Sequence, residues 1–79
     1  MKDLESKTTD ELLDILIKSW CSGSRWLNII YGNAWEVQLC TSEQRIFTAV
    51  GINKSLKVAV IETLTYMKDH LNHNYIEEV

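Results

Sequence analysis

The chain has 79 residues, 46% of them apolar, and a formal net charge of −3. That length suits one small domain, and the negative charge argues against strong non-specific attraction to nucleic acid or anionic membranes. No apolar run is long enough to span a membrane, no signal-peptide pattern opens the chain, and two cysteines are too few for a disulfide framework. We therefore expect a single domain over residues 1–79 in the reducing cytoplasm, ordered over about 8–72, with a flexible N-terminus and an acidic C-terminal tail.

The first predicted element is a helix over about 9–21. Thr8 and Glu11 have the spacing of a capping box, in which the side chain of each residue binds the main-chain N–H of the other. Gly23 can adopt the left-handed conformation that stops a helix. Apolar residues recur at helical spacing and predict a buried stripe, which consists of Leu13, Leu16, Ile17 and Trp20.

Two apolar runs on either side of Gly32-Asn33 predict an antiparallel hairpin with strands at about 26–31 and 35–41. Gly-Asn tolerates the positive φ of a two-residue turn. Such a turn pairs Ile30 with Trp35, and alternation then divides the side chains between two faces. The face toward the helices is predicted to hold Trp26, Ile30, Trp35, Val37 and Leu39. The outer face is predicted to hold Leu27, Ile29, Tyr31, Glu36 and Gln38.

A third strand is predicted at about 45–50, ending at Gly51. The preceding connection contains no glycine that would fix its geometry, so an even-length and an odd-length loop both stay possible. The even-length loop, which we favour, puts Arg45 beside Cys40 and Phe47 on the outer face. The odd-length loop exchanges the two faces.

The second helix is predicted at about 55–72, with Asn53 or Ser55 as its cap. Its buried stripe consists of Leu56, Val60, Leu64, Met67 and Leu71. Both helices need an apolar surface on which to pack, and the sheet face that carries Trp35 is the candidate. The predicted fold is therefore an α+β two-layer sandwich in the order helix, three-stranded antiparallel meander, helix (αβββα).

This order of elements is similar to that of the double-stranded RNA-binding domain. In that family a lysine cluster at the start of the last helix binds phosphates, and Lys54 and Lys57 lie at the matching place here. The denser Lys-Lys-x-Ala-Lys pattern of the family is absent, and the first helix is acidic where the family reads RNA with polar residues. The resemblance implies, as an alternative function, weak nucleic-acid binding through Arg25, Arg45, Lys54 and Lys57.

The outer face of the predicted sheet is the candidate functional surface. Aromatic and arginine side chains on an apolar patch are typical of an interface hot spot, and also of a platform for single-stranded bases. The tail residues Tyr75 and Ile76 offer a third interpretation, in which they cover this face from within the chain. The candidate interface residues are Arg25, Leu27, Ile29, Tyr31, Arg45 and Phe47.

The sequence has no pattern typical of catalysis, metal binding or a cofactor. His70 and His73 have a spacing that two metal ligands can use, but no third ligand completes a site. A dyad of Cys40 with one of these histidines would join different layers of the predicted fold. We therefore expect a non-enzymatic protein-interaction or regulatory module that binds a protein partner or forms a homodimer. In general character it is similar to small accessory proteins of phages and mobile elements.

Overall fold

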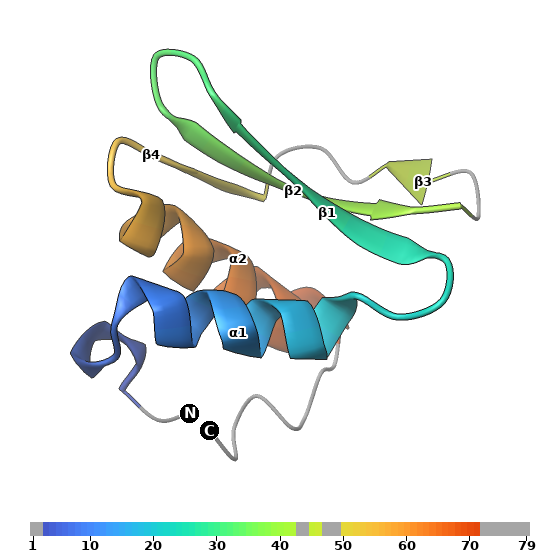
Figure 1. Ribbon diagram of the computed structural model, residues 1–79, viewed down its shortest axis with the longest axis horizontal. Helices are drawn as coiled ribbons and strands as arrows, with labels where there is room; N and C mark the ends of the chain where they lie inside the picture. The colour runs from blue at the N-terminus through green and yellow to red at the C-terminus, as the bar shows by residue number, and fades with distance from the viewer. Residues whose placement is uncertain (1–2, 43–44, 47–49, 72–79) are drawn as a thin grey trace.

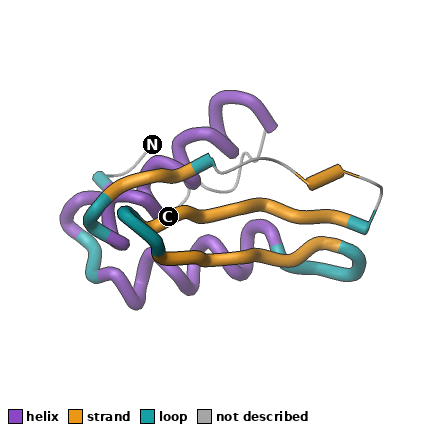
Figure 2. The backbone as a smooth tube through the Cα atoms, turned by 90° about the horizontal axis from the view of Figure 1, so that it is seen from above, coloured by secondary structure: helices purple, strands orange, loops and turns teal. Residues whose placement is uncertain are grey.

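Figure 1 shows the computed structural model, which describes residues 3–42, 45–46 and 50–71, with the main chain only for Arg45, Ile46 and Leu71. The α+β fold and its αβββα order are confirmed. Helices α1 and α2 lie on one side of an antiparallel sheet, and Figure 2, seen from the sheet side, shows the strands side by side in front of them. In chain order the elements are the 3₁₀ turn η1 (Leu4–Ser6), α1 (Thr9–Trp20), β1 (Arg25–Tyr31), β2 (Trp35–Thr41), β3 (Arg45–Ile46), β4 (Gly51–Asn53) and α2 (Leu56–Leu71).

Helix α1 begins at the predicted capping box. The Thr8 N–H donates to Glu11 Oε1 at 2.8 Å, and the Glu11 N–H donates to Thr8 Oγ1 at 3.1 Å. Gly23 has the predicted positive φ, 57°, but it does not stop the helix: α1 ends at Trp20 with an extended cap at Cys21, and Gly23 lies in the turn between Ser22 and Arg25. The predicted stripe is wrong at Ile17, which is 50% exposed. The helix packs on both the sheet and α2, so its buried side differs from the predicted stripe. The buried residues of α1 are Leu12, Leu16, Ser19 and Trp20.

The hairpin has a different register from the predicted one. Its loop has three residues, 32–34, so Tyr31 lies opposite Trp35 and Ile29 lies opposite Val37. The expected pairing of Ile30 with Trp35 is wrong, and every side chain of β1 moves to the other face. The physical reason is that β1 is apolar at both odd and even positions, so its hydrophobic pattern specifies the register only weakly.

The third strand of the sheet is split into β3 and β4, which both pair antiparallel with β2. Thr41 lies opposite Arg45, so the connecting loop has odd length, and the favoured even-length loop is wrong. Arg45 is therefore not beside Cys40 in register. Gly51 belongs to β4 and does not end the strand. Phe47 lies outside the described residues.

Helix α2 packs closely on β4 because Gly51 has no side chain. A Cβ atom built there would collide with the main-chain oxygen of Ala59 and with Thr63 Oγ1. Ser55 is the cap of the helix, since its Oγ accepts the Val58 N–H at 3.3 Å. The core combines residues from both helices, β2 and the N-terminal turn, where Leu4 extends it beyond the predicted range. Its fully buried members include Leu12, Leu16, Val37, Leu39, Val60, Leu64 and Met67.

Candidate functional site

Strand β1 forms one edge of the sheet, and part of its main chain lacks a partner among the described residues. The Ser42 N–H donates to the Ser24 oxygen, so in this antiparallel ladder the even-numbered residues of β1 bond to β2. The odd-numbered residues of β1 consequently direct their N–H and C=O groups away from the sheet.

Three odd-numbered residues make up what we name the open edge: Leu27, Ile29 and Tyr31. Arg25 exchanges main-chain bonds with Ser22, at 3.1 and 3.3 Å, and the Leu27 N–H donates to the thiol of Cys21. This leaves the Leu27 carbonyl and both main-chain groups of Ile29 and Tyr31 directed outward, with no strand beside them in the described part of the chain.

Exposed apolar side chains gather on the same strand. Trp26 is 43% exposed and Ile30 47%, both on the outer face of the sheet. Ile29 is 39% exposed and Tyr31 62%, both on the helix-facing side. We name these four residues the β1 surface; residues 26–31 include no charged side chain. An edge strand with apolar side chains and free main-chain groups is a template for another strand.

Strand β4, at the opposite edge of the sheet, is protected. It is short, and the Ile52 N–H, which points outward from it, donates to Glu62 Oε1 of α2 at 2.9 Å. The Ile52 side chain is exposed and apolar, but its main-chain N–H is not available to another strand. Strands β1 and β4 therefore differ in the property that matters for strand pairing, namely free main-chain N–H groups.

The structure corrects the predicted position of Arg25. The Arg25 guanidinium lies 4.9 Å from the centre of the Trp20 ring, a cation–π contact on the helix-facing side of the sheet. The Trp20 indole N–H donates to the main-chain oxygens of Trp26, at 2.8 Å, and Cys40, at 3.2 Å. Arg25 and Trp20 thus fasten the start of β1 to α1, and Arg25 does not stand on the outer face.

The predicted faces of the remaining β1 residues are likewise exchanged. Leu27 packs against the core, contrary to its predicted outer position. Ile29 and Tyr31 stay exposed, although they lie on the helix-facing side, because the hairpin extends beyond both helices (Figure 1). The Tyr31 ring packs on that of Trp35, which is only partly buried, with centroids 4.9 Å apart.

Sequence reasoning missed Trp26 and Ile30, which were predicted to be buried and are exposed on the outer face. The signal was present in β1, where large apolar residues stand at both odd and even positions and so occupy both faces of the strand. A strand buried on one face only normally alternates with polar residues.

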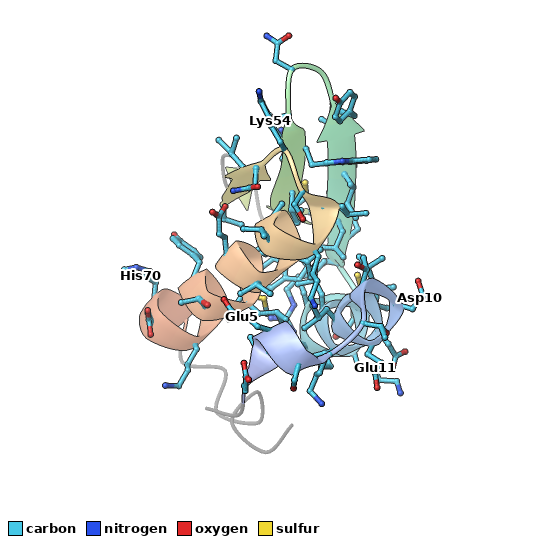
Figure 3. All side chains as sticks on the ribbon, turned by 90° about the vertical axis from the view of Figure 1, so that its left-hand side faces the viewer. Glu5, Asp10, Glu11, Lys54 and His70 are labelled. Carbon is cyan, nitrogen blue, oxygen red and sulfur yellow. The ribbon has the colours of Figure 1, made fainter. Side chains whose placement is uncertain are left out.

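Three residues of the nucleic-acid alternative have described side chains, namely Arg25, Lys54 and Lys57, and these three do not assemble into one basic surface. The Lys57 ammonium donates to the main-chain oxygen of Glu5 at 2.7 Å, and Arg25 stacks on Trp20. Lys54 is exposed at the hairpin end of the molecule, whereas Glu5 and Glu11 lie toward the other end (Figure 3). This arrangement lacks the clustered cations with which proteins contact duplex RNA.

Neither cysteine has the environment of a reactive thiol. Burial raises the pKa of the Cys21 thiol, and the Leu27 N–H opposes that shift only partly. Cys40 is buried and accepts a bond from Asn28 Nδ2 at 3.5 Å. Thiolate formation, which nucleophilic attack requires, is thus disfavoured at Cys21. Among the described residues, no cluster of histidine, cysteine and carboxylate side chains could hold a metal ion.

Within the described ranges no helix is both long and apolar enough to cross a membrane. Comparisons with protein-family models, with curated proteins and with solved structures found no match to this chain. The similarity to the double-stranded RNA-binding domain therefore rests on the order of elements alone.

Proposed function

We propose that this chain is a non-enzymatic protein-interaction module that binds a protein partner, or a second copy of itself, through β1. One observation carries the proposal: the β1 surface is apolar and lies on a strand with an open edge. Exposed apolar patches usually mark contacts between proteins, and an open edge adds main-chain hydrogen bonds to such a contact.

The free thiols of Cys21 and Cys40 agree with a reducing compartment, so we place the protein in the cytoplasm.

The test compares what the wild type and two matched variants capture from the native host. In the first variant Trp26 and Ile30 are both changed to serine, which removes large side chains from the outer face of β1. In the control, Ile52 and Val58 are changed to serine, which removes exposed apolar side chains from β4 and α2. Circular dichroism and thermal unfolding check that all three proteins are folded.

The proposal expects proteins that the wild type and the control capture and that the β1 variant loses. Equal capture by all three proteins would contradict it, because the β1 surface would then contribute nothing to binding. Loss from the control alone would place the interface elsewhere on the molecule.

The alternative function, weak nucleic-acid binding, is supported by the element order and by the exposed Lys54. It predicts binding to RNA or DNA that weakens steeply as salt rises, because cations on the protein displace counterions. Anisotropy titrations at low and raised salt measure this. Submicromolar, salt-sensitive binding that Lys54→Glu abolishes would favour the alternative, whereas binding through the apolar β1 surface should change little with salt.

A further inference from the structure

We infer that β1 pairs antiparallel with β1 of a second copy about a two-fold axis at Ile29, so that two sheets become one. This inference rests on the proposed function and names the partner of the same surface. The free main-chain N–H and C=O groups on this edge belong to Leu27, Ile29 and Tyr31, which are evenly spaced around Ile29.

The free groups select the register. In an antiparallel pair, two residues directly opposite each other can exchange both of their main-chain bonds. With Ile29 opposite its own copy, the two Ile29 residues do so, and the Tyr31 N–H meets the Leu27 carbonyl of the other chain. A shift toward the start of the strand brings Tyr31 against Arg25, whose groups already bond to Ser22. A shift toward the turn pairs Ile29 with Tyr31 but sets Leu27 opposite Asn33, so only residues 29–31 of β1 stay paired.

The side chains in this register are compatible across the axis. Ile29 lies against Ile29 and Leu27 against Tyr31 on the helix-facing side, while Asn28 lies against Ile30 on the outer face. None of these residues is charged, so no like charges oppose each other, although the whole chain carries a net charge of −3. A two-fold contact requires this self-complementarity, since the same patch meets itself.

Helix α1 adds apolar surface beside the same edge. Ile17 precedes Trp20 by three positions, so the two side chains lie on one side of the helix. The Trp20 indole bonds to the main chain of β1 and β2, which shows that this side of α1 faces the sheet. Ile17 is half-exposed there, and pairing about the axis would bring the two copies of α1 toward each other across it.

Strand β4 does not offer an equivalent edge. Each chain uses the open edge of β1 in the contact, and the Ile52 N–H of β4 already donates to Glu62. A second pairing through β4, which would lead to a fibre, therefore lacks this donor. Standard stable interfaces bury about 800 Å² per partner. One edge strand and its flanking side chains supply less than that, so the dissociation constant is expected on the order of micromolar.

The experiment measures amide hydrogen exchange by NMR over a range of concentrations from well below to well above micromolar. Protection of the Ile29 and Tyr31 amides should rise with concentration, because those N–H groups are free in one chain and bonded in the dimer. The Ile52 amide donates to the Glu62 carboxylate within a single chain and lies away from the contact, so its protection should depend much less on concentration. Protection at Ile29 and Tyr31 that does not change with concentration overturns the inference.

A chemically synthesised chain with an N-methyl group on Ile29 provides the matched variant. The methyl group replaces an N–H that points away from β2, so the bonds within the sheet stay intact. The control carries an N-methyl group on Ile52, which removes only the bond to Glu62. The inference expects a monomer for the first protein and a dimer for the second. Dimers in both would overturn it.

Failure here is distinguishable from failure of the proposed function. A wild type that is monomeric at every concentration, but whose captured proteins depend on Trp26 and Ile30, overturns self-pairing and leaves the proposed function standing. Both are overturned if the dimer forms through another surface and the β1 variant captures the same proteins as the wild type.

Discussion

Gly51→Ala is expected to destabilise the fold strongly, although it adds only one methyl group. The added Cβ would meet the main-chain oxygen and carbonyl carbon of Ala59, the latter at 3.0 Å, and the hydroxyl of Thr63. Main-chain atoms of a helix cannot rotate away as a side chain can, so α2 has to move off β4. Overpacking typically costs about 1–3 kcal/mol and occasionally more. Because the obstacle is main chain and the domain is small, we expect about 2–4 kcal/mol, or a fall in Tm of roughly 10–25 °C.

Two other glycines serve as controls, and urea unfolding followed by circular dichroism measures all three variants. A Cβ at Gly32 meets nothing within 4 Å and its φ is not positive, so Gly32→Ala should change stability by less than about 0.5 kcal/mol. Gly23 also has open space, but its φ of 57° is unfavourable for alanine, so Gly23→Ala should cost about 1 kcal/mol. If Gly51→Ala unfolds at the same urea concentration as Gly32→Ala, the close packing of α2 on β4 is refuted.

Three further predictions concern single side chains. Trp20→Phe removes the N–H that donates to the main-chain oxygens of Trp26 and Cys40. It should lower the free energy of unfolding, measured in urea, by about 1–2 kcal/mol. An unchanged urea midpoint would refute the link between α1 and the hairpin. The Thr8 main-chain N–H and hydroxyl hold the pKa of Glu11 in the folded protein below its ordinary 4.5. The ionised carboxylate therefore stabilises the fold above pH 4.5, and this stabilisation is lost as the pH falls through the lower pKa of the folded state. Glu11→Gln should therefore lack part of the acid-induced loss of stability between about pH 6 and about pH 3. Because burial raises the pKa of the Cys21 thiol, iodoacetamide should alkylate it more slowly in the folded protein than in urea, as measured by peptide mass spectrometry, and equal rates would contradict its burial.

Local signals predicted the helices and the element order well. The capping box at Thr8 and Glu11 fixes the start of α1, and it was readable because both partners lie within one turn. For α2 the sequence left Asn53 and Ser55 open as the cap, and the structure selects Ser55. The predicted apolar stripe of α2 includes Val60, Leu64 and Met67, which are all buried. The sandwich follows from these elements because each helix has one apolar side that must be covered.

The register of the hairpin was not predictable from the same kind of signal. Both faces of β1 are apolar, so a two-residue and a three-residue loop each offered an apolar helix-facing side. A tertiary contact distinguishes them, since the Trp20 indole bonds to the main chain of Trp26 and Cys40 across the strand pair. That contact joins α1 to both strands, and no local pattern contains it.

The candidate surface shows the same division between local and tertiary information. The sequence indicated correctly that β1 carries more apolar side chains than one buried face requires. It assigned Arg25 and Leu27 to the surface, whereas the first stacks on Trp20 and the second packs on the core. The protection of Ile52 by Glu62 joins β4 to α2, and its effect on which edge is open appears only in the folded chain.

Sedimentation equilibrium on a matched pair of variants tests most directly whether β1 pairs with β1 of a second copy. Ile29→Lys places a charge at the centre of the open edge, and Ile52→Lys places the same charge on the protected edge. The account predicts a concentration-dependent dimer for the wild type and for Ile52→Lys, and a folded monomer for Ile29→Lys. A wild type that remains monomeric well above micromolar concentration, or a dimer that persists in folded Ile29→Lys, would contradict it.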